Sequence, residues 1–470
     1  MSDIRLAHLT RCKPLVASFY EGDEAGPRLK RSLGVFSLTM LGVGGTIGTG
    51  IFVALTTAAP EAGPAVIVSF LLAGLTAALT ALCYAELASV LPESGSSYAY
   101  AYATLGEFAA FMIGACLLLE YAVSGSAIAV GWGQYLNELL VDLTGHRLPD
   151  AIAQPPGHGG WFNLPAVVLV ASCMILLLRG ARESARANAI LVLAKLAVLA
   201  LFVVIAFSAF RGQNLKPFAP KGIAGVGSAA STIFFSYIGL DVVSTAGDEA
   251  VEPQRTLPLA IILALVIVTA AYVLVAVAAM GAQPWTAFAG QEAGLAVILR
   301  DITGSTWPAV VLSLGAVVSI FSVTLVVIYG QTRILFAMSR DGLLPRFFQT
   351  VDPKTKVPTY NTMIVSAVIA AMAAFIPLDV LTNLTSLGTL AAFAVVSTGV
   401  IILRRTRPDL PRAYRTPLYP VLPACSVLFC LYLIASLPWV THLMFIVWLG
   451  AACFVYFSYS RRRSVLAVAA

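Results

Sequence analysis

The chain has 470 residues, of which 59% are hydrophobic and 11% are charged, and its formal net charge is +6. Soluble proteins carry about 25% charged residues, so this composition excludes a soluble globular protein and indicates an integral membrane protein. Lys and Arg also orient membrane proteins, so the positive charge does not indicate a nucleic-acid partner; lipid and a small molecule are the expected partners.

Twelve apolar segments follow one another along the chain, each a candidate span, since a membrane helix needs about 20 residues. They cover roughly residues 35–59, 63–91, 100–130, 162–180, 188–210, 223–249, 256–282, 308–339, 360–377, 381–403, 421–437 and 440–459. The first 34 residues are polar and basic, so they do not predict a cleavable signal. We therefore predict an all-α integral membrane protein with twelve transmembrane helices.

The orientation follows from the distribution of Lys and Arg. With twelve spans, both tails share one side with the loops after the even-numbered spans, and these segments hold most of the basic residues. The opposite side holds Arg147, Arg211, Lys216, Lys221 and Arg300. The positive-inside rule predicts cytoplasmic termini. The expected location is the cell membrane. The seven cysteines lie in the first tail or in apolar spans, without metal-ligand spacing, so no disulfide framework and no metal site are expected.

The first span contains a glycine-rich stretch at residues 42–52 (GVGGTIGTGIF). Glycine disfavours a continuous helix, and a break within the membrane is tolerated where the freed backbone groups line a cavity or meet a ligand. The N–H groups of Thr49 and Gly50, at the start of the second half-helix, would attract a carboxylate. The carbonyl groups that end the first half would attract an ammonium group. The stretch therefore offers a partner to each end of an amino-acid zwitterion.

The sixth span is interrupted in the same way at residues 234–241 (FFSYIGLD). Interrupted spans that lie five apart predict two five-helix repeats of inverted topology, residues 35–210 and 223–403, with the substrate at the midplane between the breaks. Residues 421–459 would add two helices outside the repeat. Residues 1–34 and 460–470 would be cytoplasmic tails.

Several short motifs along the chain together identify a family. The chain resembles the amino acid–polyamine–organocation superfamily of permeases and, within it, the bacterial cationic amino acid transporter family. The motifs are residues 48–52 (GTGIF), 84–87 (YAEL) with Pro92 and Gly95, 235–241 (FSYIGLD), 252–255 (EPQR), Arg333 with 336–345 (FAMSRDGLLP), and 412–417 (RAYRTP). The resemblance implies the LeuT-like fold with broken helices 1 and 6, alternating access, and secondary active transport.

The resemblance also implies a substrate site. The substrate carboxylate would meet N–H groups at positions that match Thr49 and Gly50, beside Gly48 of the same motif. The amine would meet carbonyl groups at positions that match Thr46, Phe235 and Ile238, and the aromatic ring that matches Phe235 would close over the substrate as a gate.

Lys195 is an isolated cation in the otherwise apolar fifth span. A central Lys costs about 2.5–3.5 kcal/mol on insertion scales, and desolvation favours its neutral form, so a function is expected in preference to an anchor that reaches the interface. In related proton-coupled permeases, a Lys in the fifth span stands where sodium-coupled relatives hold their ion, and Lys195 matches it. We therefore expect the proton to be the coupling ion, with no cofactor.

Other charged residues leave alternatives open. Glu120 in the third span could pair with a cationic substrate, accept a proton, or form a structural hydrogen bond. Asp241 could take part in proton coupling or hold the unwound segment. Charged residues near the cytoplasmic ends are expected to form a salt-bridge cluster that includes Arg255 or Arg340, and the functional alternative is an inner gate that breaks in the inward-open state. These residues are Glu86, Asp248, Glu249, Glu252 and Arg333.

The sequence thus predicts a secondary active transporter, with proton-coupled uptake of small neutral or cationic L-amino acids by alternating access. An amino acid exchanger is the alternative, and a non-transporting sensor is a third possibility. A membrane enzyme is not expected, because the four histidines lie outside the spans or at their ends.

Overall fold

The computed structural model describes residues 33–90, 96–179, 185–239, 242–245, 250–352 and 357–465. This described part of the chain is built from helices and the turns between them, apart from one isolated bridge between Leu33 and Ala250. Asp241, Asp248 and Glu249 lie outside the described residues, and so does most of the two expected tails.

Helices occupy all the segments that hydropathy selects. The long ones are α2 (Val35–Thr46), α3 (Thr49–Ala62), α4 (Val66–Val90), α6 (Glu107–Thr144), α8 (Leu164–Leu178), α9 (Ala185–Ser208), α10 (Gly222–Ile233), α12 (Pro253–Ala282), α14 (Trp307–Arg340), α15 (Thr359–Phe375), α16 (Leu378–Thr406), α17 (Val421–Ala435) and α18 (Trp439–Val455). The shorter ones used below are α5 (Ser96–Thr104), α7 (Asp150–Ala153), η4 (Phe234–Tyr237), α11 (Val242–Thr245), α13 (Gly294–Thr303) and α19 (Arg461–Arg463).

By length and apolar composition, eight helical stretches of the described chain can cross a membrane, with Val35–Val90 taken as one stretch. Three more apolar helices, α8, α15 and α17, have 15, 17 and 15 residues. At 1.5 Å per residue, such helices are somewhat shorter than the hydrocarbon core, which is about 30 Å thick.

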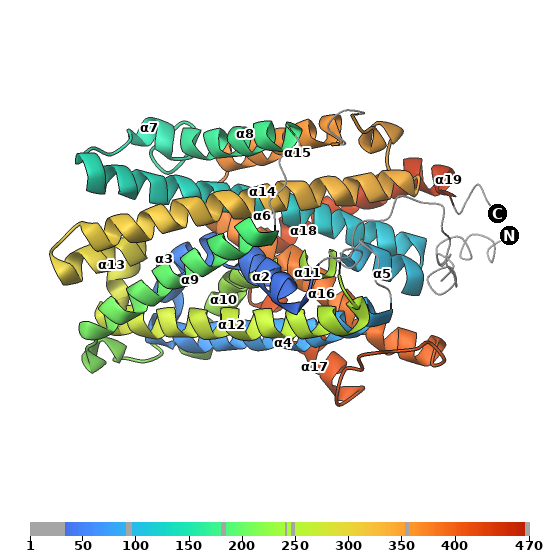
Figure 1. The fold of residues 1–470 in the computed structure, drawn as a ribbon, viewed down its shortest axis with the longest axis horizontal. Coiled ribbons are helices and arrows are strands. Elements are labelled where there is room, and N and C mark those ends of the chain that lie inside the picture. Colours follow the sequence, from blue (N-terminus) through green and yellow to red (C-terminus); the bar gives the residue numbers. More distant parts are fainter. Residues whose placement is uncertain are drawn as a thin grey trace.

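The helices form layers around the interrupted ones (Figure 1). In that view, α8 and α15 lie above α14 and α6, while α12 and α4 lie below, and α2, α3, α10 and α11 lie between these pairs. The close packing of α6 on α14 and of α4 on α12 builds the two walls that enclose the interrupted helices. One end of the bundle carries α7 and α13, and the other carries α5 and α19 (Figure 1).

The third expected span differs from its prediction. Its first part forms the separate helix α5, and α6 begins after Gly106, whose φ of 97° lies in the region that favours glycine. The helix then continues past Val130 to Thr144, where the sequence predicts a loop. The extension is held by buried contacts: the Tyr135 hydroxyl donates to the Phe52 carbonyl (2.8 Å), and the Trp132 indole N–H donates to the Val317 carbonyl (3.0 Å).

Candidate functional site

The glycine-rich stretch of the first span is interrupted, as its composition predicts. Helix α2 ends at Thr46 and α3 begins at Thr49, so Ile47 and Gly48 form the break between them. No side chain caps the start of α3, whose first N–H groups belong to Thr49 and Gly50. The first N–H groups of a helix have no partner within it, and the helix dipole adds positive potential there.

The second interruption follows η4, where Gly239 has a φ of 99°. The two breaks touch through glycine backbone. A Cβ atom built on Gly239 would lie 2.5 Å from the Gly45 carbonyl oxygen, and one built on Gly50 would lie 2.5 Å from Cα of Ser236. These glycines therefore allow the two interrupted helices to approach each other closely.

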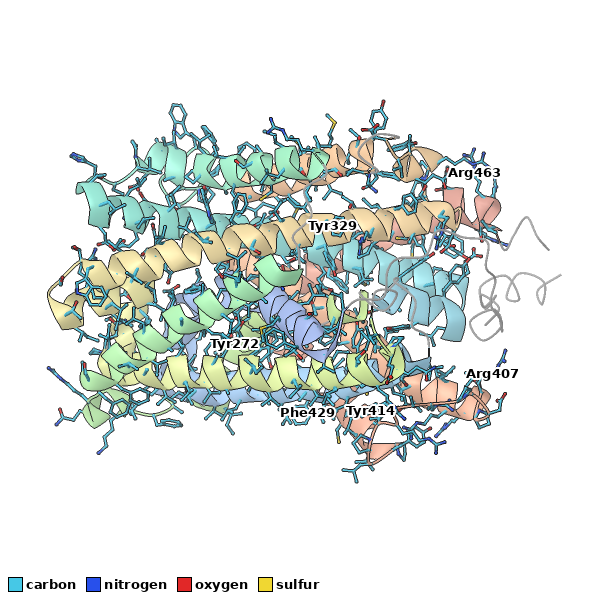
Figure 2. All side chains as sticks on the ribbon, in the orientation of Figure 1. Tyr272, Tyr329, Arg407, Tyr414, Phe429 and Arg463 are labelled. Atoms are coloured by element: carbon cyan, nitrogen blue, oxygen red, sulfur yellow. The ribbon has the colours of Figure 1, made fainter. Side chains whose placement is uncertain are left out.

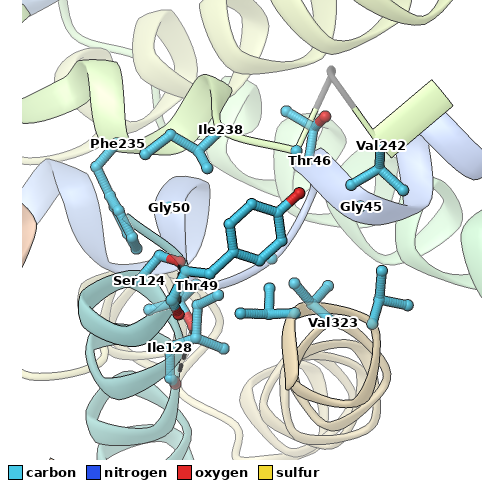
Figure 3. A pocket seen from close by; sticks show the side chains of 15 residues that line it. Gly45, Thr46, Thr49, Gly50, Ser124, Ile128, Phe235, Ile238, Val242 and Val323 are labelled. Carbon is cyan, nitrogen blue, oxygen red and sulfur yellow. Dashed lines mark hydrogen bonds between the residues drawn. The ribbon is translucent and has the colours of Figure 1, made fainter. Parts of the chain in front are cut away.

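A cavity lies between the breaks and the walls formed by α6 and α14 (Figure 3). Among the described residues that line it, none carries a charge, and most contribute backbone or aliphatic groups. They are Gly45, Thr46, Gly48, Thr49, Gly50, Tyr121, Ser124, Ile128, Phe235, Ile238, Gly239, Val242, Val323, Val326 and Val327.

The structure brings together six of the residues that the sequence assigns to substrate binding. All six line the cavity: Thr46, Gly48, Thr49, Gly50, Phe235 and Ile238. The seventh, Glu120, is buried with 2% of its surface exposed but is not among the lining residues. It faces α16, where a Cβ atom built on Gly388 would lie 3.8 Å from the Glu120 Cβ atom.

Lys195 lies on α9 beside the first break, and 3% of its surface is exposed. Its Nζ atom donates to the Gly44 carbonyl (3.0 Å) and to the Ile47 carbonyl (3.1 Å). These carbonyl groups belong to the last turn of α2 and the break, where the helix dipole is negative. The buried lysine of the fifth span is therefore held by carbonyl groups of the first span.

Tyr272 links the two breaks, and sequence reasoning did not select it. Its hydroxyl lies 2.9 Å from the Thr46 carbonyl oxygen and 2.8 Å from the Ser236 carbonyl oxygen, within donating distance of both. The side chain is fully buried in the interior of the bundle (Figure 2). The sequence gives one indication of this role: Tyr272 lies in the middle of the apolar seventh span, where a buried hydroxyl group needs a hydrogen-bond partner.

A second, smaller cavity lies towards the first turn of α16 and shares two lining residues with the first. The shared residues are Thr49 and Phe235, and the others are Val53, Ala54, Thr57, Thr232, Leu378 and Thr382. Phe235 and Thr49 therefore lie where the two cavities adjoin.

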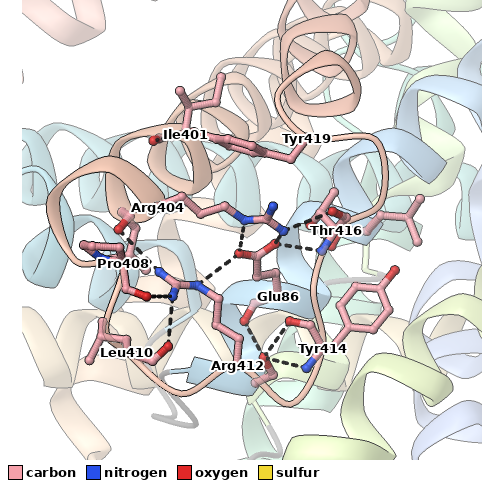
Figure 4. Close-up of polar contacts among 12 residues, drawn as sticks. Glu86, Ile401, Arg404, Pro408, Leu410, Arg412, Tyr414, Thr416 and Tyr419 are labelled. Carbon is pink, nitrogen blue, oxygen red and sulfur yellow. Dashed lines mark hydrogen bonds and ion pairs between the residues drawn. The ribbon is translucent and has the colours of Figure 1, made fainter.

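The prediction that Glu86 pairs with Arg255 or Arg340 is wrong. Arg404 of α16 binds both Glu86 oxygens (2.7 and 2.6 Å), and the Thr416 N–H donates to Oε2 (2.8 Å), as Figure 4 shows. The Arg412 Nε atom lies 3.4 Å from Oε1. Arg404 comes from the last turn of α16, and the loop after α16 folds back over the end of α4 and brings Arg412 and Thr416 to the buried Glu86 carboxylate.

The guanidinium group of Arg333, another member of the expected cluster, stacks on the Tyr329 ring at 4.1 Å from the centroid and donates to the hydroxyl of that ring. Glu252, which was placed in the same salt-bridge group, is the residue before α12 and adopts a left-handed conformation with a φ of 48°.

Interrupted apolar helices around a central cavity are typical of membrane carriers. A family model described as "Amino acid permease" matches residues 33–464. The chain therefore belongs to the amino acid permease family of the amino acid–polyamine–organocation superfamily, as the sequence motifs predict, and it is a multi-pass membrane protein.

Two relatives from Bacillus subtilis (strain 168) align over nearly their whole length. The branched-chain amino acid permease BcaP is 45% identical over 93% of this chain and 95% of its own. The methylthioribose transporter is 43% identical over 98% of this chain and 100% of its own. The vacuolar cationic amino acid transporter 4 of Arabidopsis thaliana is 37% identical over 82% of this chain, which spans 65% of that relative.

Proposed function

We propose that this protein is a proton-coupled carrier of neutral aliphatic L-amino acids that works by alternating access. The observation that carries the proposal is the cavity at the two helix breaks, where backbone polar groups face aliphatic side chains. A zwitterion needs charge-compensating groups at one end and, if its side chain is aliphatic, an apolar surface at the other.

The start of α3 provides for the carboxylate. The N–H groups of Thr49 and Gly50 have no side-chain cap, so they can donate to a carboxylate placed at the positive end of the helix dipole. The Thr49 hydroxyl donates to the Ile128 carbonyl (3.1 Å), which fixes this residue against α6.

The ammonium group would meet the carbonyl groups of Thr46, Phe235 and Ile238. The Thr46 oxygen already accepts from Tyr272, and the Phe235 oxygen accepts from the Ile238 N–H (3.3 Å). A carbonyl oxygen has two lone pairs, so each of these groups can accept one further hydrogen bond.

The substrate side chain would then lie against Ile128 of α6 and the valines of α14, Val323, Val326 and Val327. Burial of a cationic side chain without a partner is costly, and none of the described lining residues is acidic. We therefore choose the neutral substrates over the cationic ones that the sequence left open, and Glu120 is assigned to structure or protonation. The name of the branched-chain permease among the relatives supports this choice.

Lys195 would couple transport to the proton. In this structure its amine donates to two carbonyl groups at the end of α2, and these favour the charged form. A conformation in which α2 moves away would leave the amine in a dry site, which favours the neutral form. Substrate movement and proton movement would then be linked through one side chain.

The proposed architecture has twelve spans, arranged as two inverted five-helix repeats and two further helices. It needs α8, α15 and α17 to be spans despite their length, which snorkelling flanking residues and local thinning of the bilayer allow. The end with α5 and α19 would face the cytoplasm, because α19 is a run of three arginines.

A methylthioribose carrier is the second candidate, since that relative is matched over its full length and the cavity contains the hydroxyl-bearing residues Thr46, Thr49, Tyr121 and Ser124. Competition against labelled leucine in proteoliposomes separates the two. We expect leucine, valine and isoleucine to compete, and arginine, methylthioribose and decarboxylated amines to fail. Competition by isobutylamine as strong as that of valine would refute the carboxylate site, and strong competition by methylthioribose would favour the second candidate.

A further inference from the structure

Tyr121 closes the cavity on the side nearer to α5. It lies on α6 seven residues before Ile128, which places it about 10 Å closer to that end of the helix. Its side chain is 5% exposed and lines the same cavity as Phe235. Phe235 also lines the second cavity, whereas Tyr121 is not among the described residues that line it.

Gly330 of α14 provides the space that the Tyr121 ring occupies. A Cβ atom built on Gly330 would lie 2.7 Å from Cε1 of Tyr121, 3.4 Å from Cδ1 and 3.5 Å from Cζ. Two carbon atoms pack best at about 3.5–4.0 Å, so any side chain at position 330 would displace the Tyr121 ring away from α14 by about 1 Å. The glycine is therefore needed for the observed place of the ring.

Gly330 also shares a face of α14 with residues that line the cavity. It follows Val326 and Val327 by four and three residues, and residues at this spacing share one face of a helix. Both valines line the cavity. Helices α6 and α14 pack along each other, so they have little freedom to separate when the ring is pushed.

We propose that the Tyr121–Gly330 pair sets the upper size limit of the substrate side chain. This inference rests on the proposed transport of amino acids and adds the pair that would determine specificity among them. With glycine at position 330 the ring lies back against α14 and leaves room for a branched side chain. With alanine the ring moves into the cavity and shortens it.

The test compares a small and a large substrate in the same preparation. Proteoliposomes take up labelled alanine, and unlabelled leucine and alanine compete. For Gly330→Ala, we expect the leucine concentration needed for half-inhibition to rise roughly tenfold or more, because a few crowded methyl groups change affinity by that factor, while alanine competes as before. For the double variant Gly330→Ala with Tyr121→Leu, the leucine affinity should return, because the shorter side chain lacks the atom that the new Cβ contacts.

Gly315→Ala is the matched control on the same helix. Its added Cβ would lie 2.8 Å from Cγ2 of Val198 on α9, away from the cavity, so any effect should be equal for both substrates.

Uptake of alanine by the wild type tests the proposed function, whereas the ratio of leucine to alanine affinity tests the role of the Tyr121–Gly330 pair. Equal loss of alanine and leucine in Gly330→Ala, or an unchanged ratio, would overturn the inference. If Gly330→Ala does not fold, the test uses Tyr121→Leu alone. In this variant phenylalanine should inhibit alanine uptake at a lower concentration than in the wild type. Unchanged inhibition by phenylalanine would refute the role of the pair.

Discussion

Two glycines, Gly48 in the first break and Gly50 in the first turn of α3, should respond differently to the same substitution. A Cβ atom on Gly50 would lie 2.5 Å from Cα of Ser236, which is backbone and cannot rotate away. A Cβ atom on Gly48 would lie 3.2 Å from Cγ2 of Val323, a side-chain methyl group that can yield by a few tenths of an ångström. Gly50→Ala therefore forces the two interrupted helices apart, whereas Gly48→Ala needs a small adjustment.

Forced overpacking costs about 1–3 kcal/mol. If this strain arises in the conformation that holds the substrate, leucine affinity should fall roughly 5–150-fold in Gly50→Ala. Gly48→Ala should lose about tenfold at most, since the neighbouring side chain can move. The measurement is equilibrium binding of labelled leucine to purified protein, together with the melting temperature in detergent. Equal effects of the two substitutions, or a larger effect at Gly48, would refute the contact between the breaks as the reason for the glycine.

Three further predictions concern side chains around the site. Tyr272→Phe removes the hydroxyl that bonds both breaks, so leucine binding should weaken by about 1 kcal/mol, roughly fivefold, and unchanged binding would exclude that role. Glu120→Gln should leave competition by leucine unchanged, because Glu120 does not line the cavity. Selective loss of lysine or arginine uptake would instead indicate that Glu120 pairs with a cationic substrate side chain. Glu86→Ala leaves Arg404 without its buried partner at a cost of about 3–5 kcal/mol, and the melting temperature should fall clearly, whereas an unchanged value would contradict a structural role.

The interrupted helix and the buried lysine were predictable because each is a local anomaly in an apolar sequence. Glycines at 42–50 cannot favour a continuous span, and a lone cation such as Lys195 needs polar partners, which the first break provides. Both features can be recognised from neighbouring residues alone.

The contacts that depend on folding at long range were not predictable. Glu86 is paired with Arg404 and Arg412 because the end of α16 and the loop after it, more than 300 residues further along the chain, pack on α4, and no local pattern encodes that return. The same holds for Tyr272, whose hydroxyl acts through carbonyl groups of two other helices. The packing at Gly50 is of the same kind: the sequence assigns its N–H group to a carboxylate, and only the structure places the backbone of Ser236 against its Cα atom.

The most direct test of the proposed mechanism is leucine uptake into sealed proteoliposomes under an inward proton gradient, for the wild type and Lys195→Ala. The wild type should concentrate leucine with the gradient and lose this ability when a protonophore is added. Lys195→Ala should bind leucine but fail to concentrate it, because the amine on the Gly44 and Ile47 carbonyl groups is the proposed proton carrier. If Lys195→Ala concentrates leucine as the wild type does, or if the wild type ignores the gradient and only exchanges internal for external leucine, proton coupling through Lys195 is wrong.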